Sequence, residues 1–123
     1  MKSSPNNMTK LRNALFTAVM LITATNAMAH VDLSSSTPAM NASITTAPKS
    51  LVLNFSGEVM LMNIKLLDAQ RTNIPLNYKV NHDLKKTFTV PVPMLKKGKY
   101  FVVWTTMGKD GHNMNNEYSF TIK

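Results

Sequence analysis

The side chains best suited to binding a metal ion occur in two stretches near opposite ends of the sequence. His30 directly follows Ala27-Met28-Ala29, and Asp110-Gly111-His112 lies near the other end. If a signal peptidase cuts after Ala29, His30 offers two nitrogens, its free α-amine and its imidazole Nδ1, which can chelate one ion in a ring. Asp110 and His112 are two positions apart, so their side chains project to the same side of an extended segment. Gly111 between them lets the backbone bend close to a ligand.

Three nitrogens and one carboxylate oxygen favour a copper ion. A tetragonal N,O ligand set without sulfur suits Cu(II), which also stands highest in the divalent affinity series. Zn(II) accepts similar donors in a tetrahedron, so the donors alone leave the metal open. A D-G-H sequence by itself is common in solvated turns, and a histidine after a cleavage site can occur by chance. Their joint occurrence in a small exported chain favours a metal site at His30, Asp110 and His112.

Residues 1–29 have the three-part pattern of a secretory signal peptide. A positive segment with two lysines and one arginine precedes an apolar run over residues 14–22, and Ala27 and Ala29 form an A-x-A cleavage site. The apolar run is too short for a transmembrane helix, which needs about 20 apolar residues. An uncleaved N-terminal anchor is the alternative. We expect cleavage after Ala29, and residues 30–123 as a soluble periplasmic domain without a membrane span.

Composition points to one small domain that depends on its hydrophobic core. Removing 29 of the 123 residues leaves 94, and the chain has no cysteine for disulfides or thiolate metal sites. Three of the 14 Lys and Arg residues fall in the signal segment, which leaves 11 against 6 Asp and Glu residues. Nearly all of these basic residues are lysines. The sequence lacks the arginine forks and aromatic stacking platforms that favour binding of nucleic acids. We interpret them as solvated residues and expect no nucleic-acid partner.

Apolar alternation predicts an all-β fold for residues 30–123. About seven short strands separated by turn signals are typical of an Ig-like or Greek-key β-sandwich or barrel. Ser56-Gly57 is expected to end one strand before the next begins at Met60. Trp104 is expected in the core, and Met60 and Met62 are interpreted as core filling. The predicted strands cover residues 30–38, 51–55, 60–67, 74–80, 87–92, 100–105 and 118–122, of which the fourth contains Pro75 and is an edge strand or a loose connection.

The sequence resembles the CopC-type periplasmic copper-binding (copper resistance) proteins over the whole of residues 30–123. The matching residues near the start are His30-Val31-Asp32-Leu33, Ser36-Thr37-Pro38-Ala39, Ala47-Pro48 and residues 51–56. Those near the end are Lys99-Tyr100 through Trp104, Asp110-Gly111-His112 and residues 118–122. Asn41 and Asn116 stand where the family often has glycine, and asparagine tolerates the left-handed conformation better than most residues.

The resemblance implies one Cu(II) ion bound by His30, Asp110 and His112, with the amine of His30 as the fourth donor. It also implies a role in copper homeostasis or resistance by binding and delivery instead of catalysis, so we expect a protein that is not an enzyme. A copper-handling or membrane transport protein is the expected kind of partner, and a monomer the expected state.

Two other functions stay open. A small copper oxidase or monooxygenase also uses an N-terminal histidine with a second histidine, although Asp110 would fill a position that oxygen activation needs open. A metal-free Ig-like interaction module is the other alternative. A Cu(I) site needs clustered thioethers, and residues 67–78 contain no methionine. His82 is interpreted as a solvent-exposed turn residue.

Overall fold

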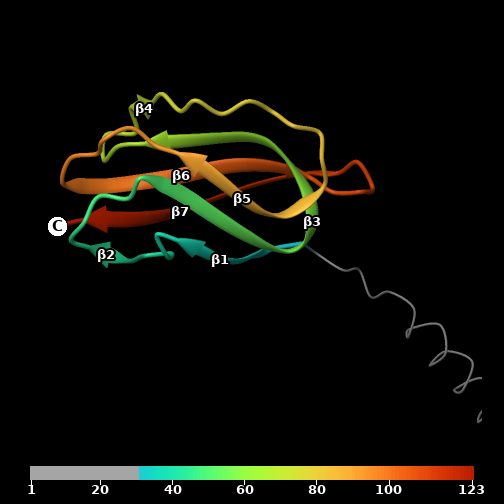
Figure 1. Ribbon diagram of the computed structural model, residues 1–123, viewed down its shortest axis with the longest axis horizontal. Coiled ribbons are helices and arrows are strands. Elements are labelled where there is room, and N and C mark those ends of the chain that lie inside the picture. The colour runs from blue at the N-terminus through green and yellow to red at the C-terminus, as the bar shows by residue number, and fades with distance from the viewer. Residues whose placement is uncertain (1–30) are drawn as a thin grey trace, which may run out of the picture. The chain divides into compact units, whose positions relative to one another are not determined.

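A computed structural model describes residues 31–123, so His30 and the predicted signal peptide lie outside the described residues. Within residues 31–123 all regular structure is β, and no helix there could span a membrane. The strands, labelled in Figure 1, are β1 (Leu33–Thr37), β2 (Ser43–Ile44), β3 (Ser50–Leu67), β4 (Asn73–Ile74), β5 (Lys85–Pro91), β6 (Gly98–Met107) and β7 (Asn113–Ile122).

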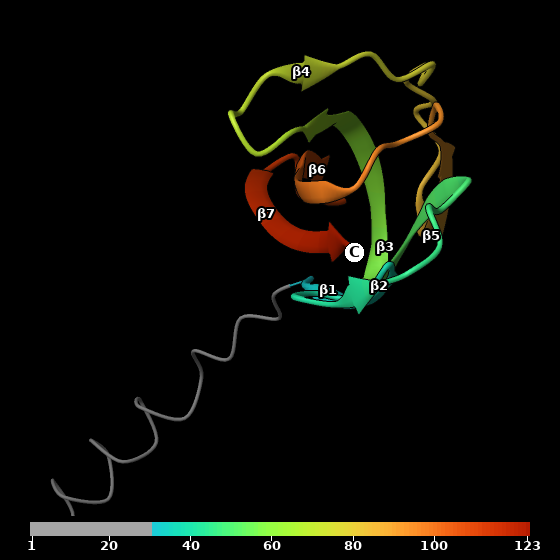
Figure 2. The ribbon, with the colours of Figure 1, turned by 90° about the vertical axis from the view of Figure 1, so that its left-hand side faces the viewer.

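The longest strand, β3, belongs to both halves of a curled sheet. Its first part pairs antiparallel with β1 on one side and β5 on the other. Its second part pairs with β6 and, at its end, with β4. The path β1-β3-β6-β7-β2 is completed by the antiparallel pairing of β6 with β7 and a short parallel pairing of β2 with β7. Figure 2 shows the curl end on, and the all-β prediction of about seven strands is confirmed.

Ser56-Gly57 does not end a strand, which corrects the sequence prediction. β3 continues through both residues and bends there, because its pairing with β5 shifts between Asn54 and Val59. The Ser56 N–H donates to the Asp32 carbonyl (2.8 Å). A Cβ on Gly57 would lie 3.1 Å from a methyl group of Val31, so glycine gives the incoming chain room to pack on the bend. The glycine interrupts the side-chain pattern while the strand continues.

The core fills the interior of the curled sheet. Trp104 is buried there, with its ring centroid 6.3 Å from that of Phe55 and 5.8 Å from that of Tyr118. The expected position of Trp104 is therefore confirmed. The buried apolar residues are Leu51, Leu53, Phe55, Val59, Leu61, Ile64, Leu66, Phe88, Val90, Leu95, Tyr100, Val102, Trp104, Tyr118, Phe120 and Ile122.

Met60 and Met62 are half-buried and lie outside this core, so their interpretation as core filling is wrong. A β-bulge between Leu61 and Asn63 shifts the register with β6. Because a one-residue shift exchanges the two faces of a strand, Leu61 points inward before the bulge and Ile64 points inward after it. The sequence shows the alternation of this strand but not the bulge.

The segment that follows β4 is the loose connection that Pro75 predicts. β4 pairs with β3 over only two residues, and regular pairing with β3 resumes at Lys85 opposite Val59. Ile74, Leu76 and Tyr78 are partly buried against the core. The Tyr78 hydroxyl donates to the Leu61 carbonyl (2.7 Å), which holds this segment against β3 without a backbone ladder.

The observed register of β3 predicts that Leu61 contributes more than its neighbour Met62 to the free energy of unfolding. Leu61→Ala should lower the free energy of unfolding by about 2–5 kcal/mol because it opens a cavity in the core. Met62→Ala should cost about 1 kcal/mol or less, because that side chain is half-buried outside the core. Urea unfolding of both variants measures the difference, and an equal or reversed loss would contradict the register.

Candidate metal centre

Residues 108–112 form a tight turn between β6 and β7. The Gly111 N–H donates to the Gly108 carbonyl (3.0 Å), and the Gly108 N–H donates to the His112 carbonyl (3.1 Å). Gly111 has φ of 81°, a left-handed conformation that residues with a Cβ rarely adopt. The turn therefore depends on Gly111, and it presents Asp110 and His112 at the tip of the hairpin.

The structure brings these two predicted ligands into contact. One carboxylate oxygen of Asp110, Oδ1, accepts the backbone N–H of His112 (3.1 Å), and the other, Oδ2, lies 2.9 Å from Nδ1 of the His112 ring. A Cβ on Gly108 would lie 3.1 Å from Oδ1, so the glycine leaves room for the carboxylate. The Asp110 side chain is 62% exposed and the His112 side chain 80%, so the pair is accessible from solvent.

The hydrogen bonds of this pair prepare both groups for a cation. The backbone N–H of His112, followed by its side chain, lowers the pKa of Asp110 below its ordinary value. The carboxylate therefore stays ionised throughout the neutral range. A neutral ring that donates its Nδ1–H to Asp110 keeps the lone pair of Nε2 available for a metal. Histidines that bind metals commonly donate their other ring N–H to a carboxylate in this way.

Val31, the first described residue, packs on the bend of β3 next to Glu58, which contacts this turn. Lys109, within the turn, places Nζ 3.2 Å from Oε1 of Glu58. Glu58 follows Gly57, the residue on which Val31 packs. The sequence gives no signal for the Lys109–Glu58 pair, because its partners are far apart in the chain and both are surface residues.

Other potential donors do not gather elsewhere in the described part of the chain. Within residues 31–123, no three His, Cys, Asp or Glu side chains lie close enough to hold a metal ion. His82 is exposed in its turn, as expected from the sequence. Met60 of β3 lies opposite Met107 of β6, while Met114 lies opposite Thr106 and is 39% exposed.

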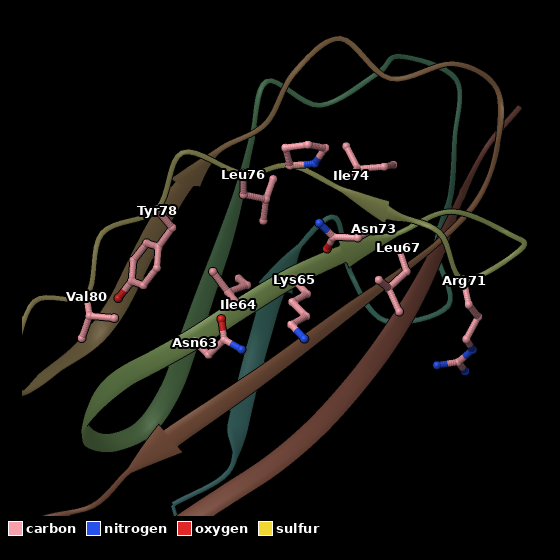
Figure 3. Close-up of a pocket in the computed structure, with 11 residues that line it drawn as sticks. Asn63, Ile64, Lys65, Leu67, Arg71, Asn73, Ile74, Leu76, Tyr78 and Val80 are labelled. Carbon is pink, nitrogen blue, oxygen red and sulfur yellow. The ribbon is translucent and has the colours of Figure 1, made fainter.

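The groove of Figure 3 lacks metal donors of the types considered above. It has a volume of about 640 Å³ and lies between β3 and the segment that contains β4. Its charged lining residues are Lys65 and Arg71, and it contains no carboxylate, imidazole or thioether. The turn at Asp110 and His112 is therefore the stronger candidate for a metal centre.

Comparisons with known proteins relate the whole β domain to one family. Residues 33–123 match the CopC domain family. Protein YobA of Escherichia coli K12 is 34% identical over 117 residues, covering 92% of this chain and 94% of that protein. Copper resistance protein C of Escherichia coli is 28% identical, covering 94% of this chain and all of that protein.

Solved structures show the same fold. PcoC, described as a methionine-rich copper resistance protein from Escherichia coli, superposes with a TM-score of 0.63 at 26% identity, over 77% of this chain and all of that one. CopC from Methylosinus trichosporium OB3b gives 0.64 at 24% identity, over 76% of this chain and 94% of that one. With the match to the family over nearly the whole β-unit, the chain belongs to the CopC family of copper resistance proteins.

Proposed function

We propose that this protein binds one Cu(II) ion in the periplasm through His30, Asp110 and His112 and serves copper homeostasis or resistance. Residues 1–29 are the removed signal peptide in this proposal, so the α-amine of His30 becomes the fourth donor. The observation that carries it is the contact between Asp110 and His112 on an exposed turn. The copper resistance proteins among the relatives support the choice of metal.

The position of Val31 supports His30 as the missing donor. Val31 packs on Gly57, and the adjacent Glu58 forms the ion pair with Lys109 of the turn. Val31 is thus held next to the segment that contacts the turn, which supports a donor role for the residue that precedes it in the sequence. An amine and an imidazole from that residue, with Nε2 of His112 and the carboxylate of Asp110, make an N,O set that suits Cu(II).

Exposure of the turn favours binding and delivery over catalysis. With Asp110 62% and His112 80% exposed, an ion held here remains accessible to a second protein. A copper-handling or membrane transport protein is the partner class that we propose, with the protein itself a monomer. Nothing in the described part of the site specifically favours an oxidase.

Replacing the histidine of the turn tests the proposal directly. His112→Ala should weaken Cu(II) binding about 100-fold or more, because it removes a ligand whose supporting contacts alone are worth about 10–100-fold. His82→Ala is the matched control, since His82 is an exposed histidine in another turn. Calorimetric titration with Cu(II) should separate the two variants, and unchanged affinity of His112→Ala would refute the site.

Asp110 should contribute both as a ligand and through the orientation of His112. Asp110→Asn should lower Cu(II) affinity about 10–100-fold, because it removes the negative charge and the carboxylate partner of Nδ1. Asp83→Asn, at an exposed turn residue, should bind copper as the unchanged protein does. Equal affinities of all three proteins would exclude Asp110 from the site.

Cu(II) affinity should fall as the pH is lowered from 8 to 5. The amine and both imidazoles must be free of protons to bind, so protons compete with the metal. The lowered pKa of Asp110 keeps its carboxylate ionised over this range, so Asp110→Asn should have the same pH slope as the unchanged protein. Titrations at several pH values measure both slopes, and affinity independent of pH would contradict this ligand set.

A further inference from the structure

Lysines that are scattered in the sequence gather at the end of the β-unit opposite to the metal turn. This end contains the start of β3, the end of β7 and the β5–β6 connection, and it is the end marked C in Figure 1. Backbone contacts join these segments: the Val92 N–H donates to the Lys49 carbonyl (3.0 Å), and Gly98 pairs with Ile122. The basic end, as we call it, is defined by Lys49, Lys96, Lys97, Lys99 and Lys123.

The basic end has an excess of positive charge, with five lysines and no ion pair to a carboxylate within residues 31–123. None of its lysines forms an ion pair with a described residue, since the Lys and Arg pairs there are Arg71–Glu117 and Lys109–Glu58. Asp68, in the nearby β3–β4 turn, uses one oxygen to accept the backbone N–H groups of Gln70 and Thr72. The end that carries the metal turn is different, because its lysines are accompanied by acidic residues. These are Asp32, Glu58, Asp83 and Asp110.

An apolar side chain protrudes among these lysines. Met94, in the β5–β6 connection, is 95% exposed. The backbone around it is held in place, because Leu95 is buried in the core and the Tyr100 hydroxyl donates to the Lys96 carbonyl (2.7 Å). Lysines around a protruding apolar residue are the combination by which proteins bind membrane interfaces, where the apolar group enters the headgroup region and the ammonium groups remain among the phosphates.

We propose that the basic end docks on the surface of an anionic phospholipid bilayer, with Met94 inserted at the interface. A bilayer fits better than an acidic protein, because lysines are hydrated point charges without the fork geometry that selects a particular carboxylate. Spread over several chain segments, they match a diffuse anionic surface. Docking in this orientation holds Asp110 and His112 at the far end, accessible to another protein.

Vesicle binding tests the proposal on the processed protein recovered from the periplasm of an expressing bacterium. It should float with vesicles containing phosphatidylglycerol, and not with pure phosphatidylcholine vesicles. Each lysine near an anionic surface strengthens binding about five-fold, so K96Q/K97Q should weaken it about 25-fold. K85Q/K86Q removes the same charge at the other end, beyond a screening length of about 8 Å, and should change binding less than about two-fold. Thermal unfolding of both variants checks that the fold is retained.

A nitroxide label tests the contact of Met94, because the chain has no native cysteine. A label attached to M94C should become shielded from a water-soluble relaxation agent when vesicles are added, whereas one on K85C should stay accessible. Equal loss of binding in the two lysine variants, or a label at 94 that stays accessible, overturns the proposal. Binding to polyglutamate without binding to vesicles also overturns it and identifies an acidic protein as the partner class.

Discussion

The continuation of β3 through the bend at Ser56 and Gly57 determines how the rest of the β-unit is arranged. Because β3 bends at Gly57 without ending, one strand forms the middle of both halves of the sheet and holds β1, β5, β6 and β4 along its edges. The buried faces of these strands then enclose one aromatic and aliphatic core around Trp104. A break at the bend would leave two small sheets, each with exposed edges and too little apolar surface to be stable alone.

The same bend connects the fold to the candidate metal centre. Val31 packs on Gly57, and Glu58 beside it contacts Lys109 of the turn that carries Asp110 and His112. Exposed ion pairs of this kind contribute little to stability, about 1 kcal/mol or less. The contact between Glu58 and Lys109 therefore orients the turn more than it stabilises the fold. The turn itself is shaped by Gly111 and by the hydrogen bonds of Asp110.

Local patterns in the sequence predict much of this structure. Alternation of apolar residues indicates the strands, Pro75 indicates the loose connection after β4, and Asn41 does adopt the left-handed conformation that replaces a glycine, with φ of 60°. The spacing of Asp110 and His112 predicts side chains on the same side of an extended segment. They do lie in contact, but in a tight turn at Gly111 instead of an extended segment.

The features that the sequence does not reveal depend on contacts between distant segments. The bulge after Leu61 reverses the expected faces of Met60 and Met62, and it is visible only in the register between β3 and β6. The bend at Gly57 resembles a strand end, because glycine interrupts the side-chain pattern while the strand itself continues. The lysines are spread along the sequence, and only the fold places several of them at one end of the β-unit. The part played by His30 depends on processing, which no contact within residues 31–123 records.

The central claim, that the processed amine of His30 binds copper, is tested most directly by comparing two proteins. One begins at His30 and the other carries one extra residue before it, and both are titrated with Cu(II) by calorimetry and electron paramagnetic resonance. The account predicts that the extension weakens binding by orders of magnitude and changes the Cu(II) spectrum, because it converts the amine into an amide. Equal affinities and identical spectra of the two proteins would contradict it.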